Sequence, residues 1–215
     1  MQIFVDTAEI EEVKKAKLIG LADGVTTNPT LIQKSGRDFK KTILEISNLI
    51  EGPVFAETVS EDAEGIVKEG RDMSKWAANV VVKIPINRPG LEAVKILETE
   101  GIRTALTLVF SAGQALLAAK AGASYICPFV GRLDDVGLSG MELIREIMDV
   151  YNNYSYLETG VIVASLRTPN HIIESALIGA DGVTVPYKLI EQLGQHPMTD
   201  MGIKKFLDDW KKVRS

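Results

Sequence analysis

The sequence predicts an α/β protein folded as one closed barrel of eight parallel strands and eight helices, with an additional helix at its C-terminal end. Short runs rich in β-branched residues alternate with amphipathic helical stretches, and this alternation implies right-handed βαβ units and a parallel sheet. Eight such units fit into 215 residues, a suitable length for a compact (β/α)8, or TIM, barrel. No Gly-x-Gly-x-x-Gly motif follows the first strand, so an open dinucleotide-binding sheet, the main competitor, has little support.

The expected strands are short runs dominated by β-branched and other apolar residues. They span residues 3–6, 24–28, 54–59, 80–85, 104–109, 124–129, 161–165 and 182–186. The expected helices carry apolar residues three or four positions apart. They span residues 8–18, 39–50, 62–78, 91–99, 112–121, 138–151, 169–178 and 187–193. The helix over 62–78 is more polar than the others and is assigned from the helix-start residues Ser60-Glu61-Asp62.

A short internal echo supports a repeated structural unit. Residues 22–26 read Ala-Asp-Gly-Val-Thr, and residues 180–184 repeat the same five letters. Both copies follow a helix and lead into a strand, where the glycine can supply a left-handed turn at the helix end. We interpret the echo as a structural signal that carries no chemistry.

The chain is expected to form a single barrel domain over residues 1–215, in which 199–213 is the additional C-terminal helix. The apolar side of this helix consists of Met201, Phe206, Leu207 and Trp210. A closed barrel has no strand left for a ninth helix to cover. The exposed aromatic side chains therefore favour a contact with a neighbouring subunit.

Composition and charge argue against several classes of partner. The formal net charge of −5 gives no electrostatic reason to expect nucleic acid. No apolar run is long enough to span a bilayer, and the N-terminus lacks the basic start and apolar middle of a signal peptide, so we expect a cytoplasmic protein without a membrane partner. The single cysteine, Cys127, can form neither an intrachain disulfide nor a metal site, and the two histidines lack metal-ligand spacing.

The segment Val80-Val81-Val82-Lys83-Ile84-Pro85 carries the candidate catalytic residue. Three consecutive valines indicate a buried strand, and Lys83 lies near its end. Burying an ammonium group is costly, and a lysine can avoid that cost by losing its proton. A neutral amine is the nucleophile needed to form a Schiff base with a carbonyl group. The alternative is a strand-end lysine whose aliphatic stem packs while its head group reaches solvent.

Other polar residues also lie at the C-terminal ends of otherwise apolar strands, where barrel enzymes place their active sites. Because strand side chains alternate, residues two apart share a face. On this basis Lys83 lies with Val81, Glu57 with Phe55, and Ser165 with Val163. The complete set of polar strand-end residues is Asp6, Thr26, Asn28, Glu57, Lys83, Thr107 and Ser165.

This set predicts chemistry on a hydroxylated, anionic substrate. Two carboxylates, Asp6 and Glu57, can divide the proton transfers that accompany imine formation and carbon–carbon bond cleavage. Arg132 follows the sixth strand, and Arg167 follows the seventh just before a helix that opens at Pro169. Arginines beside a helix N-terminus are suited to phosphate, although both could instead form surface salt bridges.

These residues resemble the transaldolase family. The segments that carry the resemblance occur in family order and extend over nearly the whole chain. They are residues 23–31 (Asp-Gly-Val-Thr-Thr-Asn-Pro-Thr-Leu), 82–85 (Val-Lys-Ile-Pro), 107–111 (Thr-Leu-Val-Phe-Ser), 128–132 (Pro-Phe-Val-Gly-Arg) and 164–167 (Ala-Ser-Leu-Arg). The match is to the short, single-barrel branch, which holds both transaldolases and fructose-6-phosphate aldolases.

The resemblance implies catalytic roles. Lys83 would form an imine with a ketose phosphate, and Asp6 would accept the C4 hydroxyl proton as the C3–C4 bond breaks. Glu57 and Thr107 would hold the water that moves protons during imine formation. No metal or organic cofactor is implied, because the protonated imine is the electron sink.

The resemblance also implies how phosphorylated sugars bind. Asn28 would contact the dihydroxyacetone unit, with help from Thr26 and Ser165. Arg132, together with Ser165 and Arg167, would bind the phosphate. The implied pathway is the non-oxidative pentose phosphate pathway. The implied donor is sedoheptulose 7-phosphate or fructose 6-phosphate, and the acceptor is glyceraldehyde 3-phosphate or erythrose 4-phosphate.

Two positions distinguish the members of this branch. The aldolases carry a glutamine where Glu57 stands and a tyrosine where Phe129 stands, so this chain is expected to transfer dihydroxyacetone and not release it. The alternatives are a fructose-6-phosphate aldolase and an inactive phosphosugar-binding barrel. Asn87 and Pro89 depart from the family pattern but still indicate a helix cap followed by a first-turn proline. A homo-oligomer, a pentamer or a decamer, is expected.

Overall fold

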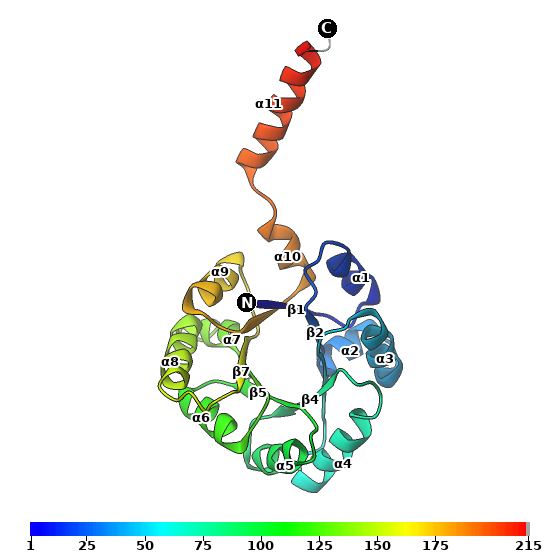
Figure 1. Ribbon diagram of the computed structural model, residues 1–215, viewed down its shortest axis with the longest axis vertical. Coiled ribbons are helices and arrows are strands. Elements are labelled where there is room, and N and C mark those ends of the chain that lie inside the picture. The colour runs from blue at the N-terminus through cyan, green and yellow to red at the C-terminus, as the bar shows by residue number, and fades with distance from the viewer. Residues whose placement is uncertain (214–215) are drawn as a thin grey trace.

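The computed structural model describes residues 1–213 and confirms the predicted barrel (Figure 1). Eight parallel strands pair in sequence order, and β1 pairs with β8 to close the sheet. The strands are β1 (Gln2–Asp6), β2 (Gly24–Thr26), β3 (Val54–Glu57), β4 (Val80–Pro85), β5 (Thr104–Val109), β6 (Tyr125–Pro128), β7 (Gly160–Val163) and β8 (Gly182–Val185).

Helices surround this barrel, as the ring of coiled ribbons in Figure 1 shows. The long helices that follow the strands are α1 (Ile10–Leu18), α3 (Phe39–Leu49), α4 (Ala63–Met73), α5 (Arg88–Thr99), α6 (Ala112–Ala121), α8 (Gly140–Asn152) and α9 (Pro169–Ile178). The shorter helices are α2 (Pro29–Ser35), α7 (Val130–Asp134) and α10 (Tyr187–Leu193), and the chain ends with α11 (Pro197–Val213).

Helices α2 and α7 are absent from the sequence prediction. None of the seven residues of α2 is buried, so no apolar period marks it. It begins because the Asn28 side chain caps it and Pro29 occupies its first turn. Helix α7 has only five residues, which is too short for a periodic pattern. Both helices follow strands at the barrel end that carries the polar residues.

Some helix boundaries also differ from prediction. Helix α5 begins at Arg88, three residues early, because Asn87 Oδ1 accepts a hydrogen bond of 2.8 Å from the Gly90 N–H. The cap-and-proline interpretation of residues 87–89 is therefore confirmed. Helix α11 begins at Pro197, and α4 ends at Met73, five residues before its predicted end.

The strand side chains alternate between two apolar layers. In β4, Val80 and Val82 face the surrounding helices, whereas Val81 faces the barrel interior. The inner layer consists of Phe4, Phe55, Val81, Ala105, Cys127, Ile162 and Ala164. This layer fills the barrel below its C-terminal end, so polar strand-end residues lie above an apolar floor.

The glycines of the internal echo do not supply the left-handed turn that we predicted, because Gly24 and Gly182 begin β2 and β8 without a positive φ. The aspartates of the echo, in contrast, have a structural role. Asp23 Oδ2 accepts a hydrogen bond of 2.7 Å from the Ile3 N–H, and Asp181 Oδ2 accepts one of 2.7 Å from the Val161 N–H. Each repeated aspartate therefore satisfies the backbone of a neighbouring strand near its N-terminal end. These ends lie opposite the polar strand ends.

Glu98, near the end of α5, forms a second group of hydrogen bonds at the N-terminal end of the barrel. Its Oε1 accepts hydrogen bonds of 2.7 and 2.6 Å from the N–H and hydroxyl of Thr104. It also accepts bonds of 2.9 and 2.8 Å from the N–H and hydroxyl of Ser124. A single carboxylate oxygen thus links α5 to the starts of β5 and β6.

Helix α11 projects away from the barrel (Figure 1). None of its 17 residues is buried, so its apolar residues face outward in the isolated chain. Within residues 1–213, no helix combines the length and the apolar character needed to cross a membrane.

Candidate active site

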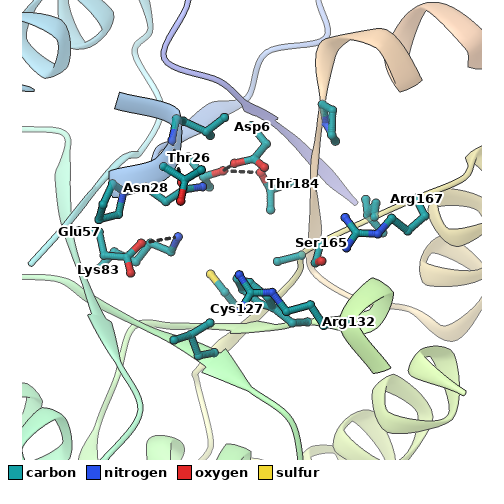
Figure 2. Close-up of a pocket in the computed structure, with 18 residues that line it drawn as sticks. Asp6, Thr26, Asn28, Glu57, Lys83, Cys127, Arg132, Ser165, Arg167 and Thr184 are labelled. Atoms are coloured by element: carbon teal, nitrogen blue, oxygen red, sulfur yellow. Dashed lines mark hydrogen bonds and ion pairs between the residues drawn. The ribbon is translucent and has the colours of Figure 1, made fainter. Parts of the chain in front are cut away.

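A cavity of about 410 Å³ opens at the C-terminal end of the barrel (Figure 2). It is formed where the strands end and their connecting loops begin. The predicted site residues that line it are Asp6, Thr26, Asn28, Glu57, Lys83, Phe129, Arg132, Ser165 and Arg167. Residues from β1, β2, β3, β4 and the segments after β6 and β7 therefore meet in one place.

Lys83 lies at the floor of this cavity. It points inward from β4, as its parity with Val81 predicts, and is only 4% exposed. Its Nζ lies 3.0 Å from Glu57 Oε2 and donates a hydrogen bond of 3.2 Å to the Thr27 carbonyl. Glu57 is directly opposite Lys83 in the β3–β4 register. The adjacent carboxylate compensates the buried ammonium and can also take its proton.

Asp6 lies at the end of β1, beside Thr26 in the strand register. The Thr26 hydroxyl donates a hydrogen bond of 2.8 Å to Asp6 Oδ1. Burial raises the pKa of the Asp6 carboxyl above its ordinary value, although the Lys83 charge and the Thr26 hydrogen bond act in the opposite direction. Asp6 thus combines access to the cavity with a carboxyl environment suited to accepting a proton.

Thr184 also lines the cavity, although the sequence analysis did not predict it. Its hydroxyl is hydrogen-bonded to that of Thr26 (Figure 2). The sequence signal that could have identified Thr184 was the internal echo, because Thr184 ends residues 180–184 just as Thr26 ends the identical residues 22–26. We interpreted that repeat as structural only, whereas it also supplies two facing hydroxyls.

Asn28 follows β2 and has two roles in the geometry of the site. Its Oδ1 accepts a hydrogen bond of 3.0 Å from the Leu31 N–H and thereby caps α2, while the residue also lines the cavity. The cap holds the Asn28 side chain in one orientation.

Thr107 behaves differently from the other predicted residues. It is buried in β5 and does not line the cavity, and its Oγ1 has no hydrogen-bond partner among residues 1–213. The next residue, Leu108, has a φ of 60° at a register shift between β5 and β6, and it reaches the cavity wall. A bulge of this kind redirects side chains at a strand end.

The parity prediction for Ser165 was wrong, although the residue does line the cavity. Val163 packs in the outer layer, so strand alternation alone would turn Ser165 outward as well. Strand β7 ends at Val163, and Ser165 has a φ of 61°, a left-handed conformation that is uncommon for serine. The backbone turn after the strand, and not the strand itself, places Ser165 in the cavity wall.

Gly131 holds the Ser165 segment against α7. Its N–H donates a hydrogen bond of 3.0 Å to the Ser165 carbonyl. A Cβ atom at position 131 would lie 2.1 Å from that carbonyl oxygen and 2.8 Å from Cγ of Arg167. Glycine is therefore required for α7, which carries Arg132, to approach the loop that carries Arg167.

Both candidate anion-binding arginines are exposed at the rim of the cavity. The Arg132 guanidinium lies 4.9 Å from the centre of the Phe129 ring, and within residues 1–213 it forms no ion pair. Arg167 Nη2 donates a hydrogen bond of 2.8 Å to Asp135 Oδ2. The salt-bridge alternative thus describes Arg167 in this conformation, although an exposed pair of this type is weak and can yield to a stronger anion.

His171 supports the same rim. Its Nδ1 accepts a hydrogen bond of 3.3 Å from the Arg167 N–H, and its Nε2 lies 3.2 Å from Asp134 Oδ2.

Burial raises the pKa of Cys127, on the cavity floor, to about 12, so its thiol remains protonated. Within residues 1–213, no three His, Cys, Asp or Glu side chains are grouped as metal ligands.

Comparison with known proteins places this geometry in a family. Residues 3–215 match the model of the family described as transaldolase/fructose-6-phosphate aldolase. A probable transaldolase of Aquifex aeolicus is 59% identical over 213 residues, which cover 99% of this chain and 98% of the relative. A probable transaldolase of Methanococcus maripaludis is 59% identical over 210 residues, covering 98% of this chain and 97% of the relative.

Among solved structures, a designed cube-shaped, porous protein cage made by fusing symmetric oligomeric domains has a similar fold. It matches with a TM-score of 0.62 and 12% identity, over 100% of this chain and 78% of the cage chain. At that identity the similarity concerns the fold alone. The family match and the two relatives extend over almost the entire sequence, so the chain belongs to the transaldolase/fructose-6-phosphate aldolase family.

Proposed function

We propose that this protein is a transaldolase, which transfers a dihydroxyacetone unit from a ketose phosphate to an aldose phosphate through a Schiff base on Lys83. The observation that carries the proposal is the Lys83 amine at the floor of the cavity. Its Nζ is 3.0 Å from the Glu57 carboxylate, and Asp6 lines the same cavity. The names of the relatives, probable transaldolases, agree with this reaction.

Imine formation needs the free amine of Lys83 and loss of the substrate carbonyl oxygen as water. Glu57 is close enough to take the proton from the ammonium and to return it to the departing hydroxyl. The Thr107 hydroxyl, buried on a neighbouring strand and without a protein partner among residues 1–213, is a candidate for holding the water involved.

Cleavage of the C3–C4 bond then requires a base at the C4 hydroxyl. We assign that base to Asp6, whose raised pKa makes it a better proton acceptor than an ordinary aspartate. The electrons of the broken bond move into the protonated imine and form an enamine on Lys83. The aldose phosphate leaves, and a second aldose phosphate accepts the three-carbon unit by the reverse sequence.

The sugar would bind beside the acid–base residues, and its phosphate would bind on the opposite side of the cavity. Asn28 and Thr26 lie on the side of β2, whereas Ser165, Arg132 and Arg167 lie on the opposite side (Figure 2). Two guanidinium groups at one rim suit a phosphate dianion. The proposed donors are sedoheptulose 7-phosphate and fructose 6-phosphate, and the proposed acceptors are glyceraldehyde 3-phosphate and erythrose 4-phosphate, in the non-oxidative pentose phosphate pathway.

Phe129 favours transfer over release of free dihydroxyacetone. Its ring lies in the cavity wall and contacts both the Arg132 guanidinium and the Phe110 ring, whose centre is 5.9 Å away. A phenyl ring has no proton to give to the enamine or to a water molecule, so the enamine persists until an acceptor arrives. Glu57, in place of a glutamine, fits the same preference.

The primary test is borohydride trapping with fructose 6-phosphate, followed by mass spectrometry of the peptide that contains Lys83. We expect a reduced three-carbon adduct on Lys83, and Lys83→Ala should abolish both the adduct and turnover. Full turnover by Lys83→Ala would show that the imine mechanism is wrong. An intact protein that forms no adduct would support the inactive phosphosugar-binding barrel.

The second test separates transfer from release. With erythrose 4-phosphate present, a transaldolase should form sedoheptulose 7-phosphate, and without an acceptor it should release little dihydroxyacetone. Release at a comparable rate without acceptor would instead identify a fructose-6-phosphate aldolase. The matching family model includes both activities, so this measurement decides between them.

We further propose that α11 contacts a neighbouring subunit in a homo-oligomer, a pentamer or a decamer. Its exposed apolar residues are Met198, Met201, Ile203, Phe206, Leu207, Trp210 and Val213. A helix with this much apolar surface and no buried residue is best stabilised by a partner. After removal of residues 197–215, light scattering should show an assembly with fewer subunits. An unchanged number of subunits would contradict this assignment.

A further inference from the structure

Three side chains from adjacent strands form a hydrogen-bonded chain that ends at the Asp6 carboxyl (Figure 2). Strand β1 lies between β2 and β8, with Asp6 opposite Thr26 and Phe4 opposite Thr184. The Thr184 hydroxyl meets the Thr26 hydroxyl, which lies 2.8 Å from Asp6 Oδ1. Both threonines are nearly inaccessible, with 1% of Thr26 and 4% of Thr184 exposed.

The direction of these hydrogen bonds follows from the number of protons. A hydroxyl group donates one hydrogen bond, and an ionised carboxylate donates none. When Asp6 is ionised, Thr26 must therefore use its proton for Asp6. The proton between the two hydroxyls must then come from Thr184.

We propose that Thr184 is a positioning residue for Asp6, acting through Thr26. By donating to the Thr26 oxygen, Thr184 fixes the Thr26 hydroxyl with its proton directed at the carboxylate. This inference rests on the proposed function, in which Asp6 is the base for bond cleavage. Hydrogen bonds in a chain also polarise one another, so donation from Thr184 strengthens the bond from Thr26 to Asp6.

The same chain can serve the protonated state of Asp6. When Asp6 has taken the proton of the substrate hydroxyl, Asp6 can donate to Thr26, and Thr26 can donate to Thr184. The Thr184 proton then turns into the cavity that this residue lines. Only the substrate proton is transferred to another atom. Each threonine proton stays bonded to its own oxygen and only rotates about the C–O bond.

The test begins with Thr184→Val, which removes the hydroxyl and keeps the shape and the strand preference of the side chain. We expect kcat/KM to fall by about three- to tenfold, the factor that corresponds to the loss of one hydrogen bond. The acid limb of the pH profile should move to higher pH, because the Asp6 carboxylate loses stabilisation relative to its protonated form. Thr184→Ser retains the hydroxyl and should restore both quantities.

A double-mutant cycle tests the route through Thr26. If Thr184 acts only through Thr26, then Thr26→Val combined with Thr184→Val should cost no more than Thr26→Val alone. Independent, multiplying losses would contradict this route. Unchanged kcat/KM and pH profile in Thr184→Val would overturn the inference itself, and Thr184→Ala gives the same readout if the valine variant does not fold.

A matched control distinguishes a positioning role for Thr184 from a purely structural one. Thr104→Val removes the hydroxyl of another buried strand threonine, at the opposite end of the barrel. It should lower stability without altering the pH profile. A shift of the pH profile in Thr104→Val equal to that in Thr184→Val would contradict the positioning role.

Lys83→Ala distinguishes failure of this inference from failure of the proposed function. If Lys83→Ala is inactive while Thr184→Val behaves as the unaltered protein does, the positioning role of Thr184 is wrong and the proposed function stands. An active Lys83→Ala would overturn the proposed function.

Discussion

Removal of the Glu98 side chain should destabilise the protein far more than removal of a glutamate two residues away. The Glu98 Oε1 holds four hydrogen bonds that link α5 to β5 and β6. Thr104 is 0% exposed, so in Glu98→Ala its N–H and hydroxyl lose their partner inside the protein. Ser124 lines a second cavity at this end of the barrel and can be rehydrated.

The expected cost follows from the two buried donors. Each unsatisfied buried polar group costs about 1–3 kcal/mol, so Glu98→Ala should lower the free energy of unfolding by about 2–6 kcal/mol. At a central value of about 4 kcal/mol, the melting temperature of a chain of this size should fall by about 8–16 °C. Urea titration followed by circular dichroism at a fixed protein concentration measures the first quantity, and calorimetry measures the second.

Glu100→Ala is the control, because Glu100 lies at the same helix end and carries the same charge. Glu100 forms an exposed, two-pronged pair with Arg71, with N–O distances of 2.9 and 2.5 Å. Exposed pairs of this kind contribute at most about 1 kcal/mol. Equal losses in the two variants would refute the reasoning, because they would show that the donors of Thr104 find other partners.

Three other results are expected. Burial raises the pKa of Asp6, and the base must be ionised, so kcat/KM should rise with pH around a pKa above that of an ordinary aspartate. Between the ordinary and the raised pKa the folded state binds more protons than the unfolded state, so the free energy of unfolding should fall as pH rises. Asp6→Asn should remove this pH dependence, as urea titrations at several pH values would show. Gly131→Ala forces a Cβ to within 2.1 Å of the Ser165 carbonyl oxygen, so we expect a higher KM for fructose 6-phosphate or a protein that does not fold. A folded variant whose KM is unchanged in steady-state kinetics would contradict this close approach. Phe129→Tyr places a hydroxyl in the cavity wall, so dihydroxyacetone release without acceptor should increase relative to transfer, as product chromatography would show; an unchanged ratio would count against the role given to Phe129.

Strand periodicity was enough to predict the barrel and the position of Lys83. The valines that precede Lys83 fix its parity, and a closed barrel brings the C-terminal ends of all strands together. The prediction of cavity-lining residues succeeded for Asp6 and Glu57 for the same reason.

No comparable signal exists in the sequence where the backbone leaves the regular strand conformation. Leu108 and Ser165 adopt left-handed φ values of 60° and 61°, and neither residue is of a type that indicates such a turn. Helix α2 was missed because it buries nothing, so it has no apolar period. Thr184 was missed for a different reason, since its hydroxyl is useful only because β8 returns to pair with β1, where the Thr184 side chain reaches that of Thr26.

The cap that Asn28 provides for α2 determines what this side chain can offer a ligand. The Leu31 N–H occupies one of the two lone pairs of its Oδ1, and the cap holds the amide in place beside the cavity with its nitrogen as a donor. A carbonyl or hydroxyl oxygen of a ligand can accept a hydrogen bond from this nitrogen. A short helix that buries none of its own residues thus orients an amide donor at the edge of the cavity.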